Sequence, residues 1–481
     1  ALETCTAWKI KGGEAVKKFR APLLTRGQGG RTVNEMAPVT RVQMSPDGAQ
    51  VATGFDSGDV RTFNVSNEKQ LLCLRGHRKA VSALAYTKDG SLLASGGEDC
   101  EIVVWDVTSE TGLYRLRGHR GAVTDLKFLY NDPDSIDTPT HLISSSKDTF
   151  IKVWDLEAQF CIDTIVGHRA EVWSFDIDPA QRRMVTLSTS AELRIWRIDN
   201  ANIVLDDGKS EDERAQSGGG KILTKLGTLT RKTTERGITV RFSRDGTLLG
   251  CHGAGKQLEI YRVRTGAEVE KRVARRRKRQ REKQAKATGV TVTDEAAEAT
   301  PYNATDEYML AAIVRGSAKL RSFAFSPGSS ASEAGGGANV LLALQNNAIE
   351  QRAVDFSDKR LVKQGAAPTE LTSTLAQQGH RGDVRAVCIN QADDTVASVG
   401  KKTLKLWNVR TRQCIISAEI NYGVSVQFIP GDAHVLVGTK KGDLLLYSLA
   451  TGDCVQELTG AHGGELWSLD IKPDGMGFAT G

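Results

Sequence analysis

Membrane-spanning and secretory features are missing from this sequence of 481 residues. No apolar run approaches the roughly 20 residues that a transmembrane helix needs, and no basic segment followed by an apolar one opens the chain. Its eight cysteines stand singly, without a CxxC pair or a crowd of histidines around them, and Cys251-His252 alone is no metal site, which argues against a zinc site or a disulfide framework. We therefore expect a protein of a reducing compartment, with no membrane partner, no metal and no cofactor.

A strong overall charge is also missing, because 64 Lys and Arg face 58 Asp and Glu, a formal net charge of +6. The basic residues gather in 271–286, which holds ten Lys and Arg and one Glu. We expect a helical insertion at about 264–308 that contacts nucleic acid or serves as a nuclear-import signal, with a solvated surface helix as the alternative. The run lacks aromatics, so sequence-specific base stacking is not expected there. The candidate residues are Lys271, Arg272, Arg275, Arg276, Arg277, Lys278, Arg279 and Arg281.

A repeat of Gly-His and Trp organises the chain, whose 40% hydrophobic content is enough to bury a sizeable core. Gly-His recurs at 76–77, 118–119, 167–168 and 379–380, and a Trp follows each His after 28, 35, 28 and 27 residues. The long interval contains a polar insertion at 131–140. Self-similarity of about 40 to 45 residues with a Gly-His start and a Trp-Asp finish is typical of WD repeats, each of which forms one four-stranded propeller blade.

Polar residues recur at fixed distances before the Trp of each repeat. Ser or Thr stands ten residues before it, and Asp stands six residues before it in two of the first three repeats. WD-repeat families link such side chains by hydrogen bonds, and a satisfied buried network stiffens a fold. In the third repeat Ser190 replaces the Asp, which predicts an incomplete network. The expected structural tetrads contain His77, Ser95, Asp99, Trp105, His119, Ser144, Asp148, Trp154, His168, Thr186 and Trp196.

Catalysis is the alternative interpretation of these tetrads, because His, Ser and Asp also form nucleophilic triads. The repetition argues against it, since an active site needs one copy, and no glycine elbow surrounds these serines. The stretch "GCHGAGKQ" at 250–257 matches the spacing of a phosphate-binding loop. However, Gln257 replaces the Ser or Thr that would hold magnesium, and a strand-like segment follows where a helix should begin. We therefore expect no enzyme activity and no small-molecule substrate.

The blade pattern predicts an all-β fold of tandem WD-repeat β-propellers. We expect a first propeller of about seven blades in 1–375, interrupted by an acidic, Gly-rich loop at 199–220, and the start of a second, incomplete propeller in 376–481. An open ring exposes strand edges, so we expect the sequence to be part of a longer protein. The first propeller divides into a partial blade and segments 36–75, 77–117, 119–166, 168–206, about 221–270 and a diverged blade with "LRSFAF" and "VLLALQNNAIEQRAV".

Longer strings resemble one family of eukaryotic WD-repeat proteins. They include "IVVWDVTSETGLYRLRGHRGAVTDLKFL", "LISSSKDTFIKVWDLEAQFCIDTIVGHRAEVWSFDI" and "VLVGTKKGDLLLYSLATGD", and the resemblance extends over nearly the whole chain, including the basic insertion. The family is that of Dip two, or U three protein twelve, in the UTP-B subcomplex of the small-subunit processome. The resemblance implies tandem propellers followed by a helical C-terminal domain.

The resemblance also implies a function. It suggests a noncatalytic scaffold of ribosome biogenesis, located in the nucleolus and acting in early pre-rRNA processing and small-subunit assembly with U3 snoRNA. The implied partners are the other UTP-B subunits, including periodic tryptophan protein two, the 5′ external transcribed spacer of the pre-rRNA and the U3 snoRNP. The alternative is a propeller that binds peptides, such as a ubiquitin-ligase substrate receptor, which would require an adaptor-binding helix that we do not find in the sequence.

Overall fold

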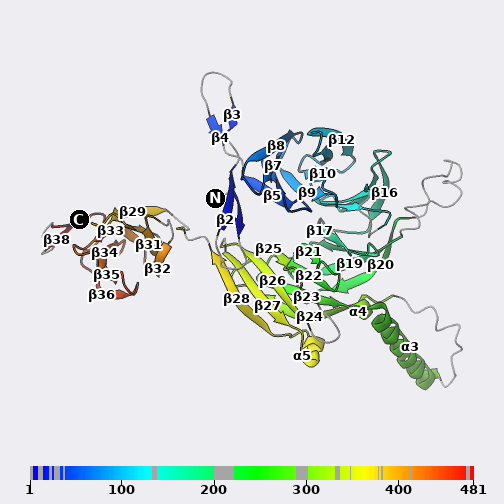
Figure 1. Ribbon diagram of the computed structural model, residues 1–481. Coiled ribbons are helices and arrows are strands. Elements are labelled where there is room, and N and C mark those ends of the chain that lie inside the picture. Colours follow the sequence, from blue (N-terminus) through cyan, green and yellow to red (C-terminus); the bar gives the residue numbers. More distant parts are fainter. Residues whose placement is uncertain are drawn as a thin grey trace. The chain divides into compact units, whose positions relative to one another are not determined.

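The computed structural model divides into two compact units, Ala1–Leu375 (unit 1) and Ala376–Gly481 (unit 2). Strands dominate both units, and consecutive strands of the chain pair within each sheet (Figure 1). The structure describes residues 4–8, 15–20, 24–26, 33–35, 38–132, 138–199, 221–288, 302–330, 336–346, 348–376, 379–380, 383–410, 414–472 and 477–481.

Unit 1 contains six four-stranded sheets among its described residues. The first two are β5 (Val39–Met44), β6 (Gln50–Phe55), β7 (Asp59–Asn64), β8 (Gln70–Arg75), and β9 (Val81–Tyr86), β10 (Leu92–Gly97), β11 (Glu101–Asp106), β12 (Thr111–Arg117). The third and fourth are β13 (Val123–Leu129), β14 (His141–Ser146), β15 (Phe150–Asp155), β16 (Phe160–Val166), and β17 (Val172–Ile177), β18 (Arg183–Ser188), β19 (Glu192–Ile198), β20 (Leu223–Thr230). The last two are β21 (Gly237–Phe242), β22 (Leu248–Gly253), β23 (Gln257–Val263), β24 (Tyr308–Arg315), and β25 (Leu320–Phe325), β26 (Gly337–Leu344), β27 (Ala348–Asp355), β28 (Thr369–Ala376).

Two hairpins and three helices complete the described part of unit 1. The hairpins are β1 (Thr4–Trp8) with β2 (Ala15–Arg20), and β3 (Leu24–Arg26) with β4 (Val33–Glu35). The helices are α3 (Gly266–Thr288), α4 (Ala304–Glu307) and α5 (Lys359–Gln364). The β1–β2 hairpin coincides with the partial first blade of the sequence analysis.

Adjacent sheets of unit 1 pack through their first strands. β5 contacts β9, β9 contacts β13, β13 contacts β17, and β17 contacts β21. This places the first strand of each sheet innermost, as in a propeller whose blades surround a central axis. The predicted fold class, an all-β protein built from WD-repeat propeller blades, is confirmed.

Apolar side chains fill the space between neighbouring blades. One cluster joins Ala94, Ile102 and Val104 of the second sheet to Leu126 and Trp154 of the third. Trp154 is 1% exposed. An aromatic side chain of this size buries about 200 Å², which stabilises the fold by roughly 5 kcal/mol at about 25 cal/mol per Å². Trp105 and Trp196 belong to equivalent clusters, so the Trp of the first three repeats is part of the contact between blades.

The blade boundaries differ from the sequence-based segmentation at two places. The segment 168–206 lacks its last strand, since β20 pairs with β19 across the acidic, Gly-rich insertion. Likewise, β24 completes the next blade only after the basic helix. Both insertions therefore connect the third and fourth strands of a blade. The acidic loop itself lies outside the described residues, apart from Asp199.

Unit 2 continues the same pattern. Its first sheet contains β29 (Val384–Ile389), β30 (Thr395–Gly400), β31 (Thr403–Asn408) and β32 (Cys414–Glu419), and its second contains β33 (Gly423–Phe428), β34 (His434–Thr439), β35 (Leu444–Ser448) and β36 (Cys454–Leu458). A hairpin of β37 (Leu469–Ile471) and β38 (Phe478–Thr480) follows. A shared core that includes Val399, Leu406 and Val437 joins the two sheets.

Candidate functional site

The first predicted tetrad is assembled in the second sheet of unit 1. His77 Nδ1 lies 3.0 Å from Asp99 Oδ1, and His77 Nε2 lies 2.8 Å from Ser95 Oγ. Trp105 Nε1 donates to the same Ser95 Oγ at 2.7 Å. A Cβ on Gly76 would lie 2.6 Å from the Trp105 ring, so the close approach of the indole explains why Gly precedes the His. The tetrad thus fastens the loop between two blades to the middle of one blade.

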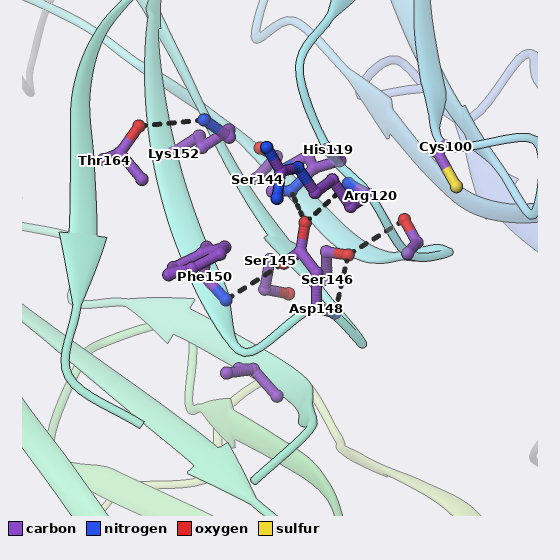
Figure 2. A network of polar contacts seen from close by, with 12 residues as sticks. Cys100, His119, Arg120, Ser144, Ser145, Ser146, Asp148, Phe150, Lys152 and Thr164 are labelled. Atoms are coloured by element: carbon purple, nitrogen blue, oxygen red, sulfur yellow. Dashed lines mark hydrogen bonds and ion pairs between the residues drawn. The ribbon is translucent and has the colours of Figure 1, made fainter. Parts of the chain in front are cut away.

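The second tetrad repeats this geometry in the third sheet. His119 Nδ1 lies 2.8 Å from Asp148 Oδ2, His119 Nε2 lies 2.7 Å from Ser144 Oγ, and Trp154 Nε1 donates to Ser144 Oγ at 2.8 Å. Figure 2 shows His119, Ser144 and Asp148 pointing toward one another. A proton on Nδ1 satisfies both ring nitrogens, since Nδ1–H then donates to the carboxylate and Nε2 accepts from the hydroxyl.

Backbone groups complete the environment of the Asp148 carboxylate. It accepts hydrogen bonds from the N–H of Arg120 at 2.9 Å and from the N–H of Phe150 at 3.0 Å (Figure 2). Burial raises the pKa of this carboxyl, but the hydrogen bonds from His119, Arg120 and Phe150 outweigh burial and lower the pKa to about 2. The ionised carboxylate therefore holds the turn between β14 and β15 against the loop that precedes β13.

The third tetrad is incomplete. His168 Nε2 lies 2.9 Å from Thr186 Oγ1, which also accepts from Trp196 Nε1 at 3.0 Å. Ser190 Oγ instead lies 2.7 Å from Ser188 Oγ, and among the described residues the buried Nδ1 of His168 has no hydrogen-bond partner. The turn between β18 and β19 also has a different backbone conformation. Cys100 and Thr149, which follow the Asp of the two complete tetrads, have φ of 68° and 75°, whereas the residue after Ser190 has no positive φ.

This environment changes the acid–base behaviour of His168. Burial, with smaller effects from the cations Arg194 and Lys225, lowers the pKa of the ring to about 3. His168 is therefore neutral throughout the physiological range.

A fourth network in unit 2 was not among the predicted tetrads. His380 Nε2 lies 2.6 Å from Ser398 Oγ, which accepts from Trp407 Nε1 at 2.7 Å, and His380 Nδ1 lies 2.9 Å from Thr403 Oγ1. The Gly-His repeat and its Trp pointed to this network. The turn between β30 and β31 is one residue shorter than the turn between β10 and β11, so Ser398 stands nine residues before Trp407. A search at the fixed distance of ten residues therefore missed Ser398.

The burial of the tetrad serines argues against the catalytic alternative. Ser95 and Ser144 are 0% exposed, and each hydroxyl is held between a His and a Trp. A nucleophile needs contact with substrate. Their placement favours the structural interpretation of these hydroxyl groups, which stays a prediction.

The phosphate-loop match at 250–257 lies within two strands and their turn. Gly250 belongs to β22, Lys256 Nζ donates to the carbonyl of Ser317 at 3.3 Å, and β23 begins at Gln257. A helix N-terminus, which a phosphate loop requires, does not follow this turn. Cys251 is 1% exposed within a core cluster, and this burial raises the pKa of its thiol to about 12.

The basic run forms the 23-residue helix α3, which leads away from the strands of unit 1 (Figure 1). Its start is defined by a Thr-x-x-Glu pattern. The carboxylate of Glu268 accepts from the N–H of Thr265 at 3.2 Å, and the carbonyl of Thr265 accepts from the N–H of Val269 at 3.0 Å. Glu268 also pairs with Arg262 of β23 at 3.2 Å. The sheet therefore determines where the helix begins.

A buried carboxylate fixes the first turns of α3. Asp306 of α4 is 5% exposed and pairs with Arg272 at 3.2 Å and with Arg276. The guanidinium of Arg264 donates to the backbone carbonyl of Asp306 at 2.8 Å. Two of the candidate RNA-binding cations thus have an acidic partner within the chain, which no local sequence pattern indicates.

Four other described cations of α3 form an exposed stripe beside Arg272. Lys271, Arg275, Lys278 and Arg279 are exposed, whereas Arg277 is only partly exposed. Positions three and four residues apart lie on one side of a helix, so these four form a continuous strip. We call them the basic stripe. The side chain of Arg281 lies outside the described residues.

Sequence comparisons agree with this architecture. The WDR3 first beta-propeller domain family matches residues 1–198, and the WD domain, G-beta repeat family matches residues 370–408. The chain contains WD repeats. The first match falls within unit 1, and the second begins at the end of unit 1 and continues into unit 2.

Individual relatives extend the similarity. The U3 small nucleolar RNA-associated protein 12 of Saccharomyces cerevisiae is 30% identical over 488 aligned residues, which cover 100% of this chain and 47% of the yeast protein. WD repeat-containing protein 3 of Mus musculus is 31% identical over 59% of this chain and 28% of its own length, and the Homo sapiens protein is 31% identical over 57% and 28%. The chain thus spans half or less of the length of these relatives. The predicted resemblance is confirmed.

Within the described ranges, no helix has the length and apolar character to cross a membrane. The same part of the chain contains no group of three or more His, Cys, Asp or Glu side chains placed to hold a metal ion.

Proposed function

We propose that this chain is part of a noncatalytic scaffold of ribosome biogenesis, the UTP-B subcomplex of the small-subunit processome, which acts with U3 snoRNA in early pre-rRNA processing. The observation that carries the proposal is the alignment of the entire chain with a U3 small nucleolar RNA-associated protein. The alternative of a ubiquitin-ligase substrate receptor has no comparable support.

The geometry of the tetrads favours a scaffold. Each complete tetrad uses its His, Ser, Asp and Trp within the blade and leaves no reactive hydroxyl at the surface. Fold alone does not decide function. A rigid platform with an extended cationic helix is nevertheless suited to hold RNA and protein together.

The basic stripe supports an RNA contact. Lys and Arg bind phosphates through charge and release condensed counterions. Arg272 and Arg276 are engaged by Asp306, so the RNA contact falls to Lys271, Arg275, Lys278 and Arg279. The 5′ external transcribed spacer of the pre-rRNA is the RNA that the family resemblance suggests. The same stripe is a candidate nuclear-import signal.

The remaining partners follow from the resemblance. We propose contacts with the other UTP-B subunits, including periodic tryptophan protein two, with the U3 snoRNP in the assembled processome, and a location in the nucleolus. The yeast and mammalian relatives continue beyond the aligned region, since the chain spans 47% and 28% of their lengths.

Depletion of the full-length protein tests the proposed function. We expect unprocessed pre-rRNA to accumulate and small ribosomal subunits to decrease, while large subunits form at their normal rate. The measurement is hybridisation of total RNA with probes for the precursor, together with gradient profiles of the subunits. Normal precursor levels after depletion would refute the proposal.

A charge variant tests the RNA contact of the basic stripe. Arg275→Gln, Lys278→Gln and Arg279→Gln together should reduce the slope of log affinity against log salt by about 2, at roughly 0.7 per lost phosphate contact. The matched control is Lys359→Gln, Arg360→Gln and Lys363→Gln on the surface of α5, which removes the same charge from exposed positions. Equal slopes for the two folded variants would exclude the stripe as an RNA contact.

A further inference from the structure

Paired lysines occupy equivalent turns in the two blades of unit 2. Lys401 and Lys402 connect β30 to β31, and Lys440 and Lys441 precede β35. In unit 1 the corresponding turns carry Asp99 and Asp148, which bind the tetrad histidines. Six residues before the aromatic residue of the third strand, two blades of unit 1 thus carry Asp and the two blades of unit 2 carry Lys401 and Lys441, although Lys147 and Asp443 stand in the same turns.

Lys401 is possible at this position because His380 does not need a carboxylate. Its Nδ1 lies 2.9 Å from Thr403 Oγ1, which takes the place of the Asp. The β30–β31 turn is thereby released from the tetrad, and among the described residues no His side chain is hydrogen-bonded to the β34–β35 turn. Lysines at these positions have no role in the His–Ser–Trp network.

A cavity of about 1700 Å³ lies between the two blades, and all four lysines line it. Lys405 and Tyr422 also contribute to its wall. Lys405 is 8% exposed, and its Nζ donates to Ser417 Oγ at 2.8 Å. Among the described residues no carboxylate lies within ion-pair distance of this ammonium group. A buried cation without a carboxylate favours an anion nearby.

Nearby carboxylates neutralise the positive charge of the exposed cavity lysines only in part. Lys440 pairs with Glu465 at 3.0 Å and Lys401 with Asp383 at 3.7 Å, but these side chains are 30% to 66% exposed, so such pairs contribute little. In the described part of the chain, Lys402 and Lys441 form no ion pair. The lining also contains Glu419 and Glu457, so five lysines stand against two carboxylates and the cavity carries an excess of positive charge.

We infer that this cavity binds the phosphodiester backbone of single-stranded RNA. The inference rests on the proposed function and adds to it a second RNA site, independent of α3. Ammonium groups bind phosphates as point charges. Tyr422, whose ring centroid lies 5.1 Å from Lys440 Nζ, provides an aromatic surface of the kind that grooves for single strands use beside their cations.

The test measures binding of a fluorescein-labelled single-stranded oligouridylate to the full-length protein at several salt concentrations. Lys402→Gln with Lys441→Gln is the test variant, because these side chains are exposed and outside every core cluster. We expect the salt slope to fall by about 1.4 and the affinity at 0.1 M salt to fall about 25-fold. Lys359→Gln with Lys363→Gln on α5 is the control of equal charge, and we expect its slope and affinity to match those of the unmodified protein.

The outcomes separate the cavity from the proposed function. Loss of affinity in the cavity variant but not in the control supports the cavity site. Unchanged affinity in the cavity variant, with loss in the α3 variant, overturns the cavity site and leaves the scaffold function intact. Polyglutamate could also displace the labelled RNA from the unmodified protein at an equal concentration of charge. That result would identify the cavity as a site for acidic protein segments and would overturn the inference. If the unmodified protein binds no RNA, RNA contact by this chain fails as a whole.

Discussion

Removal of the Asp148 carboxylate tests the structural role of the tetrads most sharply. The carboxylate accepts hydrogen bonds from His119 at 2.8 Å, from the N–H of Arg120 at 2.9 Å and from the N–H of Phe150 at 3.0 Å. Asp148→Ala removes all three acceptor contacts and adds no bulk. We expect the blade to lose stability locally without losing its fold.

The size of the expected loss of stability follows from the pKa of Asp148. The folded pKa is about 2, against a model-peptide value of 3.8. A difference of about 1.8 corresponds to roughly 2.4 kcal/mol at 1.36 kcal/mol per pKa unit. Solvent near the turn reduces the effect, so we expect Asp148→Ala to lower the free energy of local opening by about 2 kcal/mol.

Amide hydrogen exchange measures this opening at the affected residues. The amides of Arg120 and Phe150 should exchange about 30-fold faster in Asp148→Ala, since 1.4 kcal/mol corresponds to a factor of ten. Ser190→Ala is the control at the equivalent position, where the side chain does not contact the tetrad His. Exchange within twofold of the unmodified protein in Asp148→Ala, or an equal acceleration in the control, would refute the structural reasoning.

Three further predictions concern His168 and Asp306. His168 has a folded pKa of about 3 and an unfolded pKa near 6.5, so the unfolded state binds more protons as the pH falls. The contribution of His168 to stability is therefore complete above pH 6.5 and falls by about 2 kcal/mol on acidification to pH 5. Denaturant titrations at pH 7 and at pH 5 measure this difference. Ser190→Asp should provide the missing hydrogen-bond partner of His168 Nδ1. We expect this to raise the pKa of the ring and to increase stability at pH 7 by about 1 kcal/mol. An NMR titration that finds the same His168 pKa in the variant as in the unmodified protein would contradict this. Asp306→Asn should release Arg272 and Arg276 and increase tryptic cleavage in α3 several-fold, whereas Asp355→Asn, at the end of β27, should leave that cleavage unchanged.

Local sequence patterns predicted the blades because the signals within a blade are short-range. The distance from Trp105 back to Ser95 and Asp99 is set by two paired strands and one turn, so fixed spacing located all three. The same spacing missed Ser398, because a turn shortened by one residue moved it to nine positions before Trp407.

The unpredicted features depend on pairing across long insertions. Residues 223–230 have the composition of a strand, but nothing local distinguishes the last strand of one blade from the first strand of the next. The pairing of β20 with β19 and of β24 with β23 decides this in three dimensions. The ion pairs of Asp306 likewise join residues about thirty positions apart, so the charge of α3 alone could not reveal which arginines are engaged.

Co-precipitation tests the scaffold function most directly. The full-length protein would be tagged, recovered from nuclear extract at moderate salt and probed for U3 snoRNA and unprocessed pre-rRNA. We expect strong recovery of both RNAs in a particle that sediments far faster than the protein alone. Recovery of a ubiquitin-ligase adaptor without either RNA would contradict the proposed function and leave only the propeller fold.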